Sequence, residues 1–155
     1  MALTAVHELT EKQRSESHEL WNNEYPAPLK HQNQSDFESY LRNLQNKNHL
    51  VLLDSQRVVK GWYMSFRRED EKWFAMILNR EIQGRGYGSK LLNKVLKDET
   101  LLSGWVIDHD RDLRTDGTPY RSPLDFYTKH GFQVVPDIRL EQTKISAVKI
   151  IWKSK

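Results

Sequence analysis

The 155-residue sequence contains no cysteine and no long apolar run. The lack of cysteine excludes disulfides, thiolate ligands for a metal and a cysteine nucleophile. Every apolar stretch is shorter than the roughly 18 residues that cross a membrane as a helix. The first residues also lack the basic and apolar segments of a secretory leader. We therefore expect a cytoplasmic protein that does not enter a membrane.

The chain also lacks a strong excess of charge of either sign. Its 24 Lys and Arg residues outnumber 21 Asp and Glu residues, which gives a formal net charge of +3. Such a surplus is typical of a solvated surface, and a basic patch for nucleic acid or phosphate is the alternative. No repeat, low-complexity tract or linker is visible. With 37% hydrophobic residues, the sequence predicts one globular domain over residues 1–155.

Hydrophobic periodicity and turn residues predict the element order β-α-α-β-β-β-α-β-α-β-β. The strands are expected at residues 3–9, 49–54, 58–68, 71–79, 104–108, 132–135 and 144–152. The first helix should begin after Thr10, where Gln13 completes a capping box, and should end before Pro26. The second helix is predicted to begin at Ser35, with apolar residues three and four positions apart forming one buried face.

The segment Gln83-Gly84-Arg85-Gly86-Tyr87-Gly88 joins the apolar strand at 71–79 to an amphipathic helix at about 89–97. Glycines at alternate positions leave backbone N–H groups accessible to an anion. The helix that follows adds unpaired N–H donors and the positive end of its dipole. The segment therefore predicts a phosphate-binding loop. The alternative is a simple tight turn, which would not require three glycines in five positions.

Two common phosphate-binding patterns do not fit this loop. A Walker A motif needs G-x-x-x-x-G-K-[ST], which Gly88-Ser89-Lys90 does not supply. The dinucleotide pattern G-x-G-x-x-G would place its third glycine at Ser89, and the loop lies in mid-chain rather than in an early βαβ unit. The remaining pattern is Q/R-x-x-G-x-G/A, which Gln83, Gly86 and Gly88 match.

This pattern resembles the pyrophosphate-binding loop of the GNAT family of N-acetyltransferases, which bind acetyl-CoA. A second segment, Leu124–Phe132, is similar to the F-Y-x-K-x-G-F signature of that family, on a helix expected to begin at Ser122-Pro123 and to end at Gly131. The element order is also that of the family, so the resemblance covers nearly the whole chain. It implies an α/β fold of the α+β type, with a mixed, mostly antiparallel, splayed central sheet flanked by helices.

The resemblance also implies an activity and a site. Members of the family transfer an acetyl group from acetyl-CoA to a primary amine by direct attack in a ternary complex. In relatives, the strand before the loop bulges and splays from its neighbour, and pantetheine pairs with the exposed backbone. Tyr127 matches a tyrosine that protonates the departing coenzyme A thiolate. The resemblance places the coenzyme against Met76, Leu78, Gln83, Gly84, Arg85, Gly86, Tyr87, Gly88, Ser89 and Tyr127.

An amine acceptor must lose a proton, and the two motifs do not identify the general base. The first candidates are Asp108, His109 and Asp110, which follow a predicted strand next to the expected cleft. The second candidates are Glu24 and Tyr25, between the first two helices.

Asp108, Asp110 and Asp112 also resemble the opening of a calcium-binding loop. Leu113 stands where that loop needs glycine, and Pro119 stands where it needs glutamate. We therefore expect no metal site.

Two features depart from the family pattern. Arg80 takes the place of a frequent proline before the loop and could add charge near the phosphates. The polar connection 108–121 is longer than usual and, with residues 22–34, is expected to shape the acceptor pocket. Both segments carry acidic residues, which would suit a cationic amine on a small molecule or a peptide.

Two other functions stay open. One is a non-catalytic module of the same fold that binds acyl-CoA, and the other, less favoured, is an RNA-binding domain that uses the basic charge and the aromatic residues. The sequence is compatible with a monomer or a homodimer.

Overall fold

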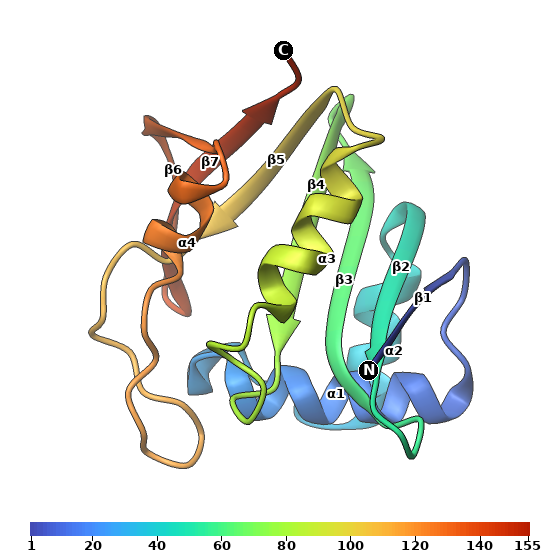
Figure 1. The fold of residues 1–155 in the computed structure, drawn as a ribbon. Coiled ribbons are helices and arrows are strands. Elements are labelled where there is room, and N and C mark those ends of the chain that lie inside the picture. The colour runs from blue at the N-terminus through green and yellow to red at the C-terminus, as the bar shows by residue number, and fades with distance from the viewer.

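A seven-stranded sheet forms the centre of the computed structural model, which describes residues 1–155 (Figure 1). The strand order is β1-β2-β3-β4-β5-β7-β6, and every neighbouring pair is antiparallel except β4 and β5. The mixed, mostly antiparallel sheet expected above is therefore confirmed. The strands are β1 (Ala2–Val6), β2 (Gln45–Leu53), β3 (Val59–Arg68), β4 (Glu71–Leu78), β5 (Leu101–Val106), β6 (Gln133–Gln142) and β7 (Ile145–Lys153).

The helices are α1 (Glu11–Glu24), α2 (Gln34–Arg42), α3 (Tyr87–Leu96) and α4 (Leu124–Lys129), with a 3₁₀ turn at Ala27–Leu29. The predicted capping box is present in α1: the Thr10 hydroxyl accepts from the Gln13 N–H at 3.1 Å, and the Thr10 N–H donates to the Gln13 side chain at 3.0 Å. Helix α2 begins earlier than predicted, because Asn33 caps it by accepting from the Asp36 N–H. No helix is long and apolar enough to span a membrane.

Helices cover both faces of the sheet (Figure 1). Residues of α1 and α2, such as Trp21 and Phe37, form one buried cluster with Trp62 of β3. Residues of α3 and α4, such as Leu91 and Tyr127, form a second buried cluster on the other face.

The sheet splays open between β4 and β5. Their only paired residues are Trp73 with Ser103 and Phe74 with Gly104. A Cβ on Gly104 would lie 2.6 Å from the Phe74 ring, so glycine allows that ring to lie directly on β5. Beyond this point the backbone of residues 75–78 has no strand partner on the β5 side.

The splay expected from the resemblance is therefore present, but the expected bulge is not. Strand β4 pairs residue for residue with β3, from Arg68 opposite Glu71 to Gly61 opposite Leu78. A tight turn at Glu69-Asp70, with φ of 53° and 64°, joins the two strands and favours this register.

Strand β6 is longer than the predicted strand at 132–135. Pro136 suggests a break in the sequence, but β6 is an edge strand, and its register against β7 shifts between Val135 and Arg139. Proline is tolerated at edges and bulges. The prediction that this strand ends at residue 135 is therefore wrong, because β6 continues to Gln142.

Candidate functional site

A cavity of about 510 Å³, called the loop cavity below, opens where the end of β4, the N-terminus of α3 and helix α4 meet. Its volume falls within the about 300–1,000 Å³ that is usual for ligand sites. The predicted coenzyme residues that line it are Met76, Leu78, Gln83, Gly84, Gly86, Gly88, Ser89 and Tyr127. Arg85 and Tyr87, which were also predicted, do not line it.

The glycine loop is shaped as an anion-binding turn. Gly84 and Gly86 have φ of 78° and 87°, and a Cβ at either position would meet nothing within 4 Å. Gly86 is the N-cap of α3 and no side chain caps this helix. The first backbone bond of α3 runs from Lys90 N to Gly86 O at 3.1 Å. The N–H groups of residues 87–89 therefore precede the helical ladder and are suited to an anion.

Two other motif residues serve the shape of the loop. A Cβ on Gly88 would lie 3.1 Å from the Phe126 ring and 3.2 Å from Leu78, so this glycine allows α3 and α4 to approach closely. The side-chain amide of Gln83 donates to the carbonyl of Leu78 at 2.9 Å and ties the loop to the end of β4.

Three tyrosines, Tyr25, Tyr120 and Tyr127, line the loop cavity together. Burial raises the pKa of all three phenols, that of Tyr120 to about 12, and those of Tyr25 and Tyr127 well above the usual value. Tyr127 is only 5% exposed. A protonated phenol in this position can donate a proton.

Glu24, at the end of α1, is the one carboxylate that lines the loop cavity. Its side chain is 5% exposed, and its Oε2 accepts from the backbone N–H and Nε of Arg80 at 3.2 and 3.3 Å. Its Oε1 lies 3.7 Å from Nε of Arg114 and accepts no hydrogen bond. This oxygen is therefore a buried acceptor without a hydrogen-bond partner, beside the Arg114 guanidinium.

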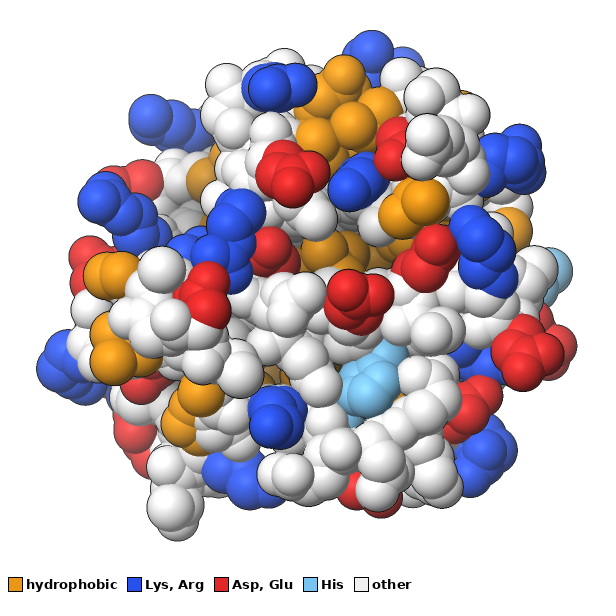
Figure 2. All heavy atoms as spheres, turned by 90° about the horizontal axis from the view of Figure 1, so that it is seen from below, with side chains coloured by type: hydrophobic (Ala, Val, Ile, Leu, Met, Phe, Trp, Pro, Cys, Tyr) orange, Lys and Arg blue, Asp and Glu red, His pale blue; other side chains and the backbone are white.

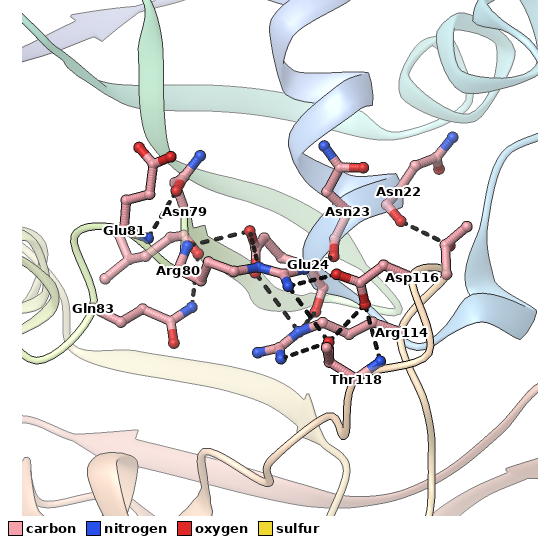
Figure 3. A network of polar contacts seen from close by, with 12 residues as sticks. Asn22, Asn23, Glu24, Asn79, Arg80, Glu81, Gln83, Arg114, Asp116 and Thr118 are labelled. Atoms are coloured by element: carbon pink, nitrogen blue, oxygen red, sulfur yellow. Dashed lines mark hydrogen bonds and ion pairs between the residues drawn. The ribbon is translucent and has the colours of Figure 1, made fainter.

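Arg80 does not reach the predicted phosphate site. Its Nη1 donates to Asp116 at 2.7 Å and its Nη2 donates to the carbonyl of Asn23 at 2.7 Å, which ties α1 to the 108–121 connection (Figure 3). Arg80 does not line the loop cavity, so the expectation that it adds charge near the phosphates has no support in the structure. The cations that line the cavity are Arg114 and Arg121, which belong to the 108–121 connection and to no recognisable motif.

The first candidates for the general base lie outside the cavity. Asp108 accepts from Nη1 and Nη2 of Arg139 at 2.9 and 3.0 Å, and these hydrogen bonds lower its pKa. Asp110 accepts from the Ser122 N–H, and His109 accepts from the Arg111 N–H. Each of the three thus has a partner within the fold, and the structure does not bring them to Tyr127.

A second cavity of about 280 Å³, called the aromatic chamber below, lies at the gap between β4 and β5. Sixteen of its 19 lining residues are hydrophobic. It shares Tyr25, Met76, Tyr120, Pro123 and Tyr127 with the loop cavity, so the two spaces adjoin there. Both loops expected to shape the acceptor pocket contribute to it, through Tyr25 and Tyr120.

The acidic residues of these loops do not line the chamber, where no carboxylate is found. The sequence-based argument for a cationic acceptor therefore has no counterpart in the chamber wall. Figure 2 shows the molecule from below, with Lys and Arg side chains interspersed among Asp and Glu side chains. This face carries no continuous basic surface of the kind that an RNA-binding domain uses.

Comparison with known families identifies the fold. A sequence profile described as the acetyltransferase (GNAT) domain matches residues 45–134. The chain belongs to the GNAT acetyltransferase family. A comparison with curated protein sequences found no match.

Solved acetyltransferase structures share the fold over almost the whole chain. An aminoglycoside 6′-N-acetyltransferase complexed with coenzyme A has a TM-score of 0.71 and 12% identity, over 99% of this chain and 97% of the other. A phosphinothricin acetyltransferase from Sinorhizobium meliloti, in complex with AcCoA, has a TM-score of 0.68 and 12% identity, over 99% and 89%. A spermidine N-acetyltransferase mutant from Vibrio cholerae has a TM-score of 0.63 and 16% identity, over 99% and 95%.

Proposed function

We propose that this protein transfers the acetyl group of acetyl-CoA to a primary amine, by direct attack of the amine in a ternary complex. The loop cavity carries the proposal, because the uncapped N-terminus of α3, the unpaired edge of β4 and the phenol of Tyr127 all face this one space. Acetyl-CoA, when bound, supplies the acetyl group as a thioester.

Separate parts of the cavity suit separate parts of this molecule. The N–H groups of residues 87–89, with Arg114 and Arg121, are suited to the phosphates. The free backbone of residues 75–78 is suited to the amides of pantetheine, as in strand addition. A backbone N–H from the same edge would polarise the thioester carbonyl.

The proton transfers can be assigned to two side chains. As the amine nitrogen bonds to the acetyl carbon, the carbon–sulfur bond breaks and the sulfur takes the phenol proton of Tyr127. The nitrogen gives up its surplus proton to the Glu24 carboxylate through water. Glu24 replaces Asp108 in this role because its carboxylate lines the cavity and keeps one oxygen free of hydrogen bonds. The chain has no cysteine for an acyl-enzyme route.

Thermal unfolding with and without acetyl-CoA tests the donor. A ligand at about 100-fold excess over its Kd stabilises the native state by about 2.7 kcal/mol. At about 2–4 °C per kcal/mol, we expect Tm to rise by roughly 5–10 °C. Acetyl-pantetheine, which lacks the nucleotide phosphates, is the matched control and should give a much smaller shift. An unchanged Tm at millimolar acetyl-CoA would contradict the proposal.

Release of free thiol from acetyl-CoA, measured across a panel of amines, tests the transfer itself. Amine-dependent release is expected for an enzyme, whereas a non-catalytic module would shift in Tm and release none. An RNA-binding domain would instead bind RNA in a salt-sensitive way and would not respond to acetyl-CoA.

A further inference from the structure

The aromatic chamber provides an argument about the acceptor, which rests on the proposed function. The chamber adjoins the loop cavity at Tyr25, Met76, Tyr120 and Tyr127. An acceptor amine placed at this junction would leave the rest of its molecule in the chamber. The chamber wall therefore indicates the chemistry of that remainder.

The wall of the chamber is mainly aromatic. Trp73 of β4 stacks on Trp105 of β5, with ring centroids 5.0 Å apart and planes at 28°. Trp21 of α1 and Tyr40 of α2, with centroids 5.2 Å apart, line another part. A volume of about 280 Å³ lies just below the usual range of ligand sites. These features favour a small, flat, apolar body.

The chamber has one cation without an ion pair, and one of its indoles has a buried N–H without a partner. The exposed Arg68 is its one charged residue. The residue opposite on β4, Glu71, is paired instead with Lys149 at 2.8 Å, and Arg68 makes no ion pair. The Arg68 guanidinium carbon lies 5.1 Å from the centre of the Phe66 ring. The buried indole Nε1 of Trp73, which is 6% exposed, has no hydrogen-bond partner either. A cation without an ion pair and the absence of a carboxylate favour an anionic group on the ligand.

The distance between Arg68 and the junction with the loop cavity indicates where an anionic group would lie on the ligand relative to its amine. Arg68 lies opposite Glu71, five residues before Met76 on β4. At about 3.4 Å per residue, five residues span about 17 Å, but the guanidinium lies over Phe66, which pairs with Trp73, three residues or about 10 Å before Met76. The guanidinium is therefore remote from the junction at Met76, and a bound anion would lie at the end of the ligand away from its amine.

We propose that the acceptor is a small arylalkylamine with an anionic group, such as a carboxylate, at the end remote from the amine. The amine enters the junction, the aryl group lies among the aromatic side chains, and the carboxylate accepts from Arg68. A second ammonium group has no carboxylate to meet in this chamber, so polyamines are disfavoured.

Binding of amines to the protein saturated with coenzyme A tests this proposal separately from turnover. The probes are phenethylamine, its para-carboxylate, spermidine and acetyl-lysine amide, measured by titration calorimetry and by quenching of tryptophan fluorescence. We expect the para-carboxylate to bind most tightly, ahead of spermidine by about tenfold or more. Tighter binding of spermidine or acetyl-lysine amide would overturn the proposal, as would no binding of any arylalkylamine.

Two adjacent arginines provide a matched pair of variants. Arg68→Gln should remove the preference for the para-carboxylate over phenethylamine, which we expect to be about fivefold. Arg67→Gln should retain that preference, because Arg67 does not line the chamber and its side chain bonds to the carbonyl of Asp70. Equal loss in both variants, or in neither, would overturn the role of Arg68.

The proposed function and the acceptor class fail in different ways. Selective binding of the para-carboxylate without thiol release would support the acceptor class and contradict the enzymatic function. Thiol release with spermidine as the preferred acceptor would support the enzymatic function and contradict the acceptor class.

Discussion

The loop cavity and the aromatic chamber share a wall, yet they are built in opposite ways. The anion site of the loop cavity is built around one contiguous segment, residues 83–89, and its backbone N–H groups, to which Arg114 and Arg121 add charge. The chamber instead takes side chains from α1, α2, α4 and from five of the seven strands. In the proposed enzyme, the donor is therefore bound mainly by backbone and the acceptor by side chains. Substitutions in the chamber can change the acceptor without disturbing the donor.

The largest expected effect is a loss of donor binding in Gly86→Asp. Asp and Asn both tolerate positive φ better than other residues, and the Cβ direction at Gly86 is open. A carboxylate at this position would repel the phosphates by several kcal/mol, which is a loss of more than about 100-fold in affinity. The shift in Tm with acetyl-CoA measures the effect.

Gly86→Asn is the matched control for this variant. It has the same backbone requirement and nearly the same volume as the aspartate variant, and it adds no charge. It should keep most of the shift in Tm. An equal loss of the Tm shift in both variants would show that the loop needs glycine for its shape. It would then give no support to phosphate binding at this loop.

The next effect concerns Tyr127, which lines both spaces. We expect Tyr127→Phe to lower kcat by about 100-fold, which is typical of a lost general acid, and to leave the acetyl-CoA shift intact. Because burial raises the pKa of this phenol, it stays protonated as the pH rises, and the wild-type rate should not fall up to about pH 10. An unchanged kcat in the phenylalanine variant would reduce Tyr127 to a packing residue.

A smaller effect, on the free energy of unfolding, is expected for variants of the two acidic partners of Arg80, Glu24 and Asp116. Glu24 is 5% exposed, whereas the Asp116 side chain is 50% exposed. Glu24→Gln should lower the free energy of unfolding by about 3 kcal/mol, because two arginines lose a buried counter-charge. Asp116→Asn should lower it by less than about 1 kcal/mol. Denaturant unfolding measures both, and equal losses would contradict the burial argument.

The sequence predicted those parts of the molecule that depend on neighbouring residues. The element order, the capping box at Thr10 and the glycine loop each depend on contacts within a few positions of the chain. The start of α2 was wrong because Asn33 and Ser35 are both acceptable N-caps and only the observed backbone distinguishes them. The length of β6 was wrong because edge position, which permits Pro136, depends on the whole sheet.

The sequence could not predict the contents of the cavities. Arg114 and Arg121 look like solvated loop residues, and they line the loop cavity only because the 108–121 connection pairs with the end of α1 through Pro26 and Arg114. The chamber is lined by residues as distant in the sequence as Trp21 and Ile145. Such long-range placement leaves no local pattern in the sequence.

The smallest expected effect is at Asp108, the first base candidate from the sequence. Its carboxylate is held by Arg139 and lines neither cavity, so Asp108→Asn should leave the rate of thiol release within about twofold of wild type. The partly exposed ion pair contributes little to stability, and unfolding should change by less than about 1 kcal/mol. A large loss of rate in a stably folded Asp108→Asn variant would transfer the base from Glu24 to Asp108. It would also mean that the 108–121 connection moves toward Tyr127 when both substrates are bound.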